Sequence, residues 1–185
     1  MLDLREGRRV LIAGTVRTPI GAFGGALRPL SAVELGKHAV TWAMKRAGVE
    51  ATAVDEVIMG HSRQAGCGPN TARQVSVGSG IPVTTPAFTV NQACASGMKS
   101  IILGAQSIAL GVSDVVIAGG MESMSNTPYL LPTARWGARL GHAQLLDGQF
   151  QDGFMCPLCG DLMGRTAERL AERYEISRSE QDEYA

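Results

Sequence analysis

Short runs rich in β-branched residues alternate with helix-like segments through the first 118 residues, and this alternation constrains the fold more than any other feature of the chain. Four such runs end at glycine, asparagine or a turn: RRVLIAGTV (8–16), VDEVIMG (54–60), PAFTVN (86–91) and SDVVIAGG (113–120). A strand, helix, strand order requires crossover connections, which give a parallel sheet covered by helices on both faces. We therefore expect an α/β fold with a mostly parallel sheet.

The helices predicted between these runs have clear start and stop signals. Ser31 and Glu34 fit a capping box, and Gly48 supplies a stop. A short helix is expected within 69–77. A longer one, from about 96 to 110, is apolar on nearly every side, which is typical of a buried helix.

After residue 118 the sequence changes character, becoming rich in Gly, Pro and Met and weakly periodic. A long irregular segment in a compact protein is usually functional or forms a subdomain, so we predict two domains, 1–118 and 119–185. An amphipathic helix is expected at 164–175. A capping box at Ser177 and Glu180 opens a last helix of very few residues, which is hardly stable alone, so the chain reads as unfinished.

Composition and charge exclude several classes of function. The formal net charge is zero and aromatic residues make up only 5%, so neither a basic nucleic-acid surface nor a stacking stripe is expected. No apolar run is long enough to cross a bilayer, and the charged start MLDLREGRR has no apolar leader. We expect a reducing, cytoplasmic environment without disulfides, while a mitochondrial address stays open.

Cys94 lies between a strand-like run and a helix-like run. Backbone N–H groups at a helix N-terminus stabilise a thiolate, which is the nucleophilic form, and they also hold a developing oxyanion. The small neighbours Ala93, Ala95 and Gly97 leave room for a substrate carbonyl and allow a tight turn. The alternative is a small buried hydrophobe, the commoner fate of a lone cysteine, which the local spacing alone slightly favours.

The wider pattern resembles a known family. Five stretches carry the resemblance, in order: RTPIGAFGGAL (17–27), GPNTARQVSVGSGIP (68–82), VNQACASGMKSI (90–101), GGMESMSNTPY (119–129) and MGRTAERLAERYEISRSEQDEYA (163–185). They are similar to the N-terminal half of the thiolases, the acetyl-CoA acetyltransferases and 3-ketoacyl-CoA thiolases. The resemblance implies a layered αβα half with a mostly parallel mixed sheet, plus part of an irregular, helix-containing loop domain.

The resemblance also implies a reaction. In thiolases the cysteine at the position of Cys94 carries an acyl group as a thioester, while a histidine and a second cysteine move protons. Acyl-CoA and coenzyme A are substrates, with no permanently bound cofactor, and the reaction is thiolysis of a 3-ketoacyl-CoA or Claisen condensation of acyl-CoAs. This covalent route divides one difficult step into two acyl transfers.

The family's proton-transfer residues lie in motifs of its second half, and no GHP-type or CxGGG-type stretch occurs here. We interpret His38, His61 and His142 as ordinary surface or core-edge residues. The isolated chain is therefore expected to have little or no activity. It should need a second thiolase half, as a separate chain or missing segment, and should form homo- or hetero-oligomers.

Other candidate positions are weaker. Met163 is a tentative acyl-pocket residue by its place in the MG motif, and Leu162 stands where family members often have histidine. One C-x-x-C pair, Cys156 and Cys159, is a weak zinc signal, so a structural role is favoured and no metal is expected. Cys67, in a Gly-rich turn, is also interpreted as structural.

Two other functions stay open at this point. One is a non-catalytic thiolase-like scaffold or lipid-transfer partner, which has no need of a thiol at Cys94. The other is a ketoacyl-synthase-type condensing enzyme, which shares the architecture and the cysteine but takes carrier-bound acyl groups. The stretches 17–27 and 119–129 fit thiolases better.

Overall fold

The computed structural model describes residues 9–185, so the charged start of the chain lies outside the described residues. The described chain divides into two compact units, and the boundary along the chain falls between Pro128 and Tyr129. The domain boundary expected after residue 118 falls inside a strand of the first unit, Val116–Gly120. The assignment of residues 119–185 to a functional loop domain stays a prediction. No helix among the described residues is both long enough and apolar enough to cross a bilayer.

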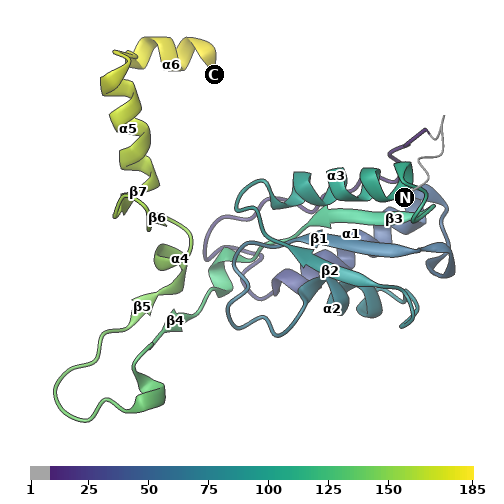
Figure 1. Cartoon of the computed structure of the whole chain (residues 1–185), viewed down its shortest axis with the longest axis horizontal. Helices are drawn as coiled ribbons and strands as arrows, with labels where there is room; N and C mark the ends of the chain where they lie inside the picture. Colours follow the sequence, from purple (N-terminus) through teal and green to yellow (C-terminus); the bar gives the residue numbers. More distant parts are fainter. Residues whose placement is uncertain (1–8) are drawn as a thin grey trace. The chain divides into compact units, whose positions relative to one another are not determined.

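The first unit is built on a three-stranded parallel sheet (Figure 1). Its strands are β1 (Glu56–Gly60), β2 (Ala87–Val90) and β3 (Val116–Gly120), in the order β2-β1-β3. The register brings the carboxyl end of each strand to one edge, where Gly60 pairs with both Val90 and Gly120. Three of the four predicted strands are thus confirmed.

Helices cover both faces of the sheet, as the α/β prediction requires. Helices α1 (Ala32–Ala47) and α2 (Thr71–Gly78) lie on one face and α3 (Ser96–Ala109) lies on the other (Figure 1). The predicted capping box is present, with the Ser31 and Glu34 side chains each accepting the other's backbone N–H, and Gly48 ends α1 in the left-handed conformation at φ 65°.

The core of this unit lies between the sheet and α1 and α2. Strand β1 is the most buried element, and Val57 is fully buried in it. Val40 and Met44 of α1 and Val75 of α2 pack into the same cluster. Because β1 has a strand on each side and helices on both faces, its continuous apolar run is what a central parallel strand demands.

The strand expected at 8–16 is not formed, which corrects the prediction for its described residues. Leu11 is 75% exposed and Ile12 is 74% exposed. Gly14 turns the backbone left-handed at φ 62° and fits against α1, where an added Cβ would lie 2.4 Å from the carbonyl of Ala43. Among the described residues no strand pairs with this segment in a ladder, so an apolar run alone did not make a strand.

Helix α3 is not buried all round, contrary to expectation. Its sheet-facing residues, including Ser100 and Gly104, are buried, but Met98 is 64% exposed and Ile102 is 44% exposed. The sheet covers one side of the helix, and nothing in the described chain covers the other. The helix therefore presents an apolar outer face.

The second unit is small and irregular. Its elements are β4 (Tyr129–Leu130), β5 (Leu146–Asp147), α4 (Gly148–Gln151), β6 (Met155–Cys156), β7 (Asp161–Leu162), α5 (Met163–Arg173) and α6 (Arg178–Tyr184). The strands form two antiparallel pairs, β4 with β5 and β6 with β7. The capping box predicted at Ser177 and Glu180 is present at the start of α6.

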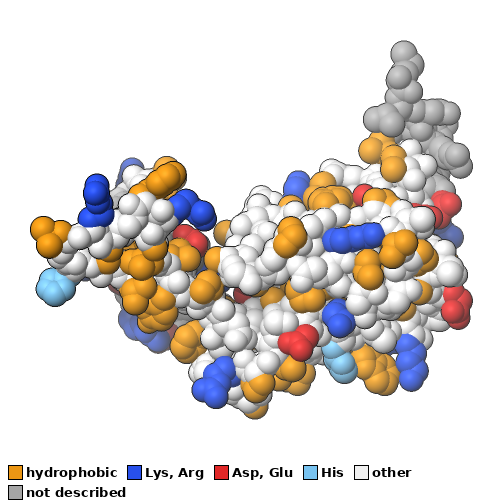
Figure 2. Space-filling view, turned by 90° about the horizontal axis from the view of Figure 1, so that it is seen from below, with side chains coloured by type: hydrophobic (Ala, Val, Ile, Leu, Met, Phe, Trp, Pro, Cys, Tyr) orange, Lys and Arg blue, Asp and Glu red, His pale blue; other side chains and the backbone are white. Residues whose placement is uncertain are grey.

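Charged side chains form no single-sign patch on the face shown in Figure 2. Lys and Arg are scattered there among Asp, Glu and hydrophobic side chains. This face therefore lacks the concentrated positive charge that a nucleic-acid backbone attracts.

Candidate active site

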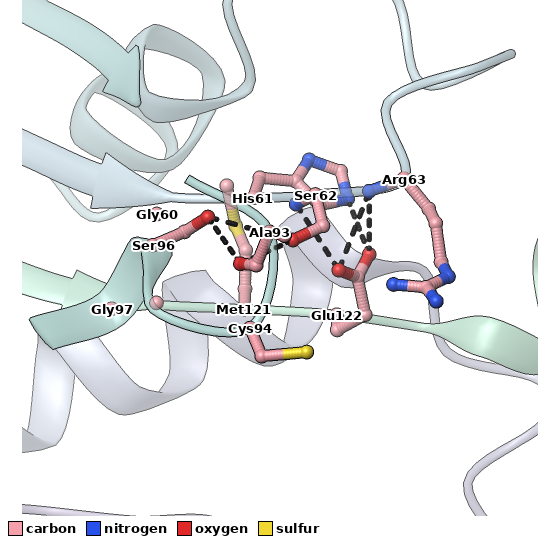
Figure 3. A pocket seen from close by; sticks show the side chains of 11 residues that line it. Gly60, His61, Ser62, Arg63, Ala93, Cys94, Ser96, Gly97, Met121 and Glu122 are labelled. Carbon is pink, nitrogen blue, oxygen red and sulfur yellow. Dashed lines mark hydrogen bonds and ion pairs between the residues drawn. The ribbon is translucent and has the colours of Figure 1, made fainter. Parts of the chain in front are cut away.

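The ends of all three parallel strands meet at one pocket of about 380 Å³ (Figure 3). Strand β2 leads to Cys94, β1 leads to His61, and β3 leads to Glu122, and all three residues line the pocket. A pocket at the carboxyl edge of a parallel sheet is where open α/β folds bind their ligands.

Cys94 follows a strained elbow. Ala93 has φ 49°, a left-handed conformation that is costly for a residue with a Cβ. The elbow is held by hydrogen bonds: Asn91 Oδ1 accepts from the Ala93 N–H at 2.9 Å, and the hydroxyls of Ser96 and Ser62 donate to the Ala93 carbonyl at 2.6 and 2.7 Å. This strained strand-to-helix turn has the geometry of a nucleophile elbow.

The Cys94 thiol is exposed and free, so it is available to react. It directly precedes Ala95, the N-cap residue of α3. Within the described residues no side chain caps this helix start. The N–H of Ser96, the first residue of α3, donates to the Ala93 carbonyl at 3.1 Å, so an oxyanion site formed by the N–H groups that follow it stays a prediction.

Two glycines at the strand ends, Gly60 and Gly120, let α3 approach this closely. A Cβ on Gly60 would lie 2.4 Å from the carbonyl carbon of Ser96 and 2.6 Å from the backbone nitrogen of Gly97. A Cβ on Gly120 would lie 3.1 Å from the Cα of Gly97. The elbow can dock on the sheet only because these positions carry no side chain.

Replacing Gly60 with alanine tests this packing. The new methyl group meets backbone atoms that cannot rotate away, so Gly60→Ala is expected to lower the free energy of unfolding by about 1–3 kcal/mol. Urea unfolding followed by circular dichroism measures the change. The matched control is Gly164→Ala in α5, where an added Cβ meets nothing within 4 Å and alanine favours the helix. Equal stability of the two variants would contradict the packing argument.

A close pair of His61 and Glu122 forms a wall of the pocket beside the elbow. His61 is only 1% exposed, and its Nε2 lies 3.1 Å from Glu122 Oε1 while its Nδ1 lies 3.0 Å from Thr71 Oγ1. The contact of Nε2 with Oε1 is close but falls short of good hydrogen-bond geometry. Glu122 accepts from the N–H groups of Ser62 and Arg63, at 3.1 and 3.3 Å. The pair thus ties the end of β1 to the end of β3.

These partners set the pKa of Glu122. Burial alone would raise the pKa of this carboxyl, but the close contact and charge of His61 and the N–H groups of Ser62 and Arg63 outweigh burial and hold the pKa below its usual value. The carboxylate is therefore stabilised in its charged form.

Acid unfolding checks the role of Glu122. A pKa lowered by folding contributes stability that is present above the unfolded value, about 4.3, and is lost as pH falls through the lower folded value. The stability advantage of the natural chain over Glu122→Gln is expected to be largest at neutral pH and to shrink through this acid range. Urea midpoints at a series of pH values measure it. An advantage that stays constant with pH would contradict the assignment.

Sequence reasoning missed His61 as a site residue. The available signal was its position directly after the strand run 54–60, at the edge where Glu122 follows another strand. The other two histidines fit the earlier interpretation: His38 is exposed and packs against Trp42 at 6.3 Å between ring centroids, and His142 is exposed.

The remaining predicted residues are not among those that line the pocket. Cys67 is half-buried, with its thiol directed at the carbonyls of Arg63 and Ala65 at 3.8 and 3.7 Å, and burial together with Glu122 raises its pKa. A protonated thiol favours the structural interpretation. Met163 begins α5 in the second unit and is 46% exposed, so its role in an acyl pocket stays a prediction.

The described residues contain no cluster of three or more His, Cys, Asp or Glu side chains arranged to hold a metal ion. The pair Cys156 and Cys159 consequently has no third ligand within residues 9–185.

Comparison with known proteins agrees with the fold. The family "Thiolase, N-terminal domain" matches residues 10–185. A cytosolic acetyl-CoA acetyltransferase of Gibberella zeae is 49% identical over 95% of this chain and 44% of its own length, and acetyl-CoA acetyltransferase 2 of Arabidopsis thaliana is 49% identical over 96% and 44%.

Two solved structures support the same family. The Bacillus anthracis acetyl-CoA acetyltransferase aligns with TM-score 0.86 and 48% identity over 91% of this chain and 42% of its own. The Acat5 thiolase from Ascaris suum, solved with coenzyme A, aligns with TM-score 0.86 and 41% identity over 91% and 44%. The fold defines an α/β protein of the thiolase type. The chain belongs to the thiolase family, and it spans less than half the length of the curated relatives that it matches.

Proposed function

We propose that this chain is the nucleophile-bearing half of a thiolase, in which Cys94 carries the acyl group between acyl-CoA and coenzyme A. The observation that carries the proposal is the exposed thiol of Cys94 on a strained elbow at an uncapped helix start. The relatives named above, which are acetyl-CoA acetyltransferases and a thiolase solved with coenzyme A, support acyl-CoA as the substrate class.

The proposed chemistry proceeds by two acyl transfers. In thiolysis the Cys94 thiolate attacks the 3-keto carbon of a 3-ketoacyl-CoA, the carbon–carbon bond breaks, and acetyl-CoA leaves after taking a proton. Coenzyme A, losing its proton, then attacks the Cys94 thioester and releases a shortened acyl-CoA. Condensation runs the same steps in reverse. An oxyanion forms at each attack, and N–H groups in the first turn of α3 are the proposed donors to it.

Proton transfer calls for residues beyond the pocket as it stands. His61 also lines the pocket, but it is only 1% exposed, with Thr71 bonded at its Nδ1 and Glu122 facing its Nε2. General acid–base help contributes about 10²–10⁴-fold to a rate. We therefore propose that a second thiolase half supplies a histidine and a cysteine, on a separate chain or a further segment.

Two apolar surfaces support the need for further polypeptide. One is the exposed face of α3. The other is a groove of about 480 Å³ between residues 10–16 and the edge of β3. Residues of α1 and α3 also line this groove. Its lining includes Leu11, Ile12 and Ile101, each of which is exposed. An open strand edge beside apolar walls favours coverage by another segment and makes association with other chains the expected state.

Alkylation of Cys94 distinguishes catalysis from a scaffold. A catalytic thiol is expected to react stoichiometrically with iodoacetamide and to be protected by acyl-CoA, because the substrate occupies the pocket. Mass spectrometry of the peptide that contains Cys94 measures both. Sluggish labelling without protection would favour the non-catalytic scaffold or lipid-transfer alternative.

A comparison of acyl donors addresses the remaining alternative. A thiolase is expected to use free acetyl-CoA in the assembled enzyme, whereas a ketoacyl-synthase-type enzyme takes the carrier-bound acyl group. The acetyltransferase relatives support the first outcome. We propose the cytoplasm as the compartment, in line with the relative named as cytosolic.

A further inference from the structure

The hairpin of β6 and β7 presents two cysteines on one tight turn. Cys156 ends β6 and pairs with Asp161 of β7, so four residues connect the strands. Gly160, left-handed at φ 66°, donates its N–H to the Cys156 carbonyl at 2.9 Å and closes the turn. Cys159 is exposed on this turn, and its neighbour Leu158 is 95% exposed. Both thiols are free and open to small reagents.

Hydrogen-bond donors of this turn lie close to the Cys156 sulfur. The backbone N–H groups of Cys159 and Leu158, and then the Cys159 thiol, donate to the Cys156 sulfur and lower its pKa below the ordinary value for a thiol. More of Cys156 is therefore present as the thiolate, which is the attacking species in oxidation and disulfide exchange. The Cys159 thiol is already within hydrogen-bonding reach of that sulfur, where a resolving cysteine belongs.

We propose that Cys156 and Cys159 form a redox-active dithiol, which hydroperoxides oxidise to an intramolecular disulfide and small thiols reduce again. This site is independent of acyl transfer at Cys94 and uses none of the pocket residues. A zinc site is not favoured, because no third ligand accompanies the pair in residues 9–185 and Asp161 already pairs with Arg169 at 2.6 Å.

The chemistry balances in two steps. The Cys156 thiolate attacks one oxygen of the peroxide, the O–O bond breaks, and with one proton water leaves, so that Cys156 becomes a sulfenic acid. The Cys159 sulfur then attacks the Cys156 sulfur, and its proton and the sulfenic hydroxyl depart as a second water. The dithiol loses two electrons, which the peroxide gains. Two molecules of a small thiol reverse the change and leave as their disulfide.

The other two thiols provide internal comparisons. Burial and the charge of Glu122 raise the pKa of Cys67, which makes it a poorer nucleophile toward peroxide. Cys94 is exposed but has no second cysteine beside it on its elbow, so its oxidation stops at the sulfenic acid or forms mixed disulfides. An intramolecular disulfide is therefore specific to the hairpin.

Peptide mapping tests the proposal on the reduced 185-residue chain. Trypsin cleaves after Arg139 and Arg165, so one peptide, 140–165, contains both hairpin cysteines and neither Cys67 nor Cys94. After brief treatment with limiting hydrogen peroxide and alkylation, this peptide is expected to lose two hydrogen atoms and take no alkyl group. Dithiothreitol should restore both alkylation sites. Oxygen added to Met155 or Met163 has a distinct mass.

Single variants assign the roles. Cys159→Ser is expected to stop at a sulfenic acid on Cys156 that a cyclic 1,3-dione traps once, whereas Cys156→Ser should give neither disulfide nor adduct in this peptide. Cys67→Ser is the matched control and should oxidise like the natural chain. Two results would overturn the proposal: peptide 140–165 keeping both free thiols while Cys94 or Cys67 is oxidised, or the folded chain forming the disulfide no faster than the free peptide.

Discussion

Mixing this chain with the C-terminal half of a related acetyl-CoA acetyltransferase, such as the Arabidopsis relative at 49% identity, is expected to raise thiolysis turnover by about 10²–10⁴-fold over the chain alone. The physical reason is that the pocket holds an exposed nucleophile, whereas its lining histidine, His61, is only 1% exposed, with Thr71 bonded at Nδ1 and Glu122 facing Nε2. Cleavage of acetoacetyl-CoA, followed by its absorbance, measures the rate.

Two controls show whether the activity of the mixture needs both halves and Cys94. The added half alone should be inactive, and the same mixture made with a Cys94→Ala chain should also be inactive. If the isolated chain turned over at the rate of the mixture, the proton-transfer groups would lie within it and the two-half account would be wrong.

Replacing Cys94 with serine in the assembled enzyme is expected to lower kcat by on the order of 10⁴-fold or more, the scale of loss when a covalent catalyst loses its nucleophile. A serine hydroxyl has nearly the same shape but is not ionised near neutral pH, so it cannot attack a thioester without a strong base. Binding of acyl-CoA should persist, because the pocket walls are unchanged.

Cys67→Ser provides the matched control for this substitution. It makes the same sulfur-to-oxygen change at a half-buried thiol that donates to the carbonyls of Arg63 and Ala65, and it should keep most of the activity. An equal loss in the two variants would indicate a structural effect of removing a thiol rather than loss of a nucleophile.

Local signals in the sequence predicted the elements that local interactions determine. The capping boxes at Ser31 and Ser177 form as expected, because their partners lie three residues away. Three of the four strand runs became strands, because each has a neighbour in the sheet. Cys94 also occupies the strand-to-helix junction that its small neighbours predicted.

Predictions that depended on long-range coverage were wrong. The run 8–16 has strand-like composition, yet its described residues pair with no other strand. Helix α3 has an apolar outer face that the described chain leaves exposed. In both cases an apolar run predicts burial, but a single sequence does not say whether the same chain provides the cover.

The pairing of His61 with Glu122 illustrates a different limit. These residues are 61 positions apart and come together because β1 and β3 are neighbours in register, with Gly60 beside Gly120. Each residue alone resembles an ordinary polar residue at a strand end. Only the strand order places the carboxylate against the imidazole and identifies the pair as a wall of the pocket.

The most direct test of the central claim is to find the acyl group. The assembled enzyme is mixed with acetyl-CoA, quenched in acid within one turnover, digested, and mapped by mass spectrometry. The account predicts one acetyl group per chain, on the peptide that contains Cys94, labile to hydroxylamine and removed by added coenzyme A. An active enzyme that carries no acetyl group on Cys94, or carries it on another residue, would contradict the account.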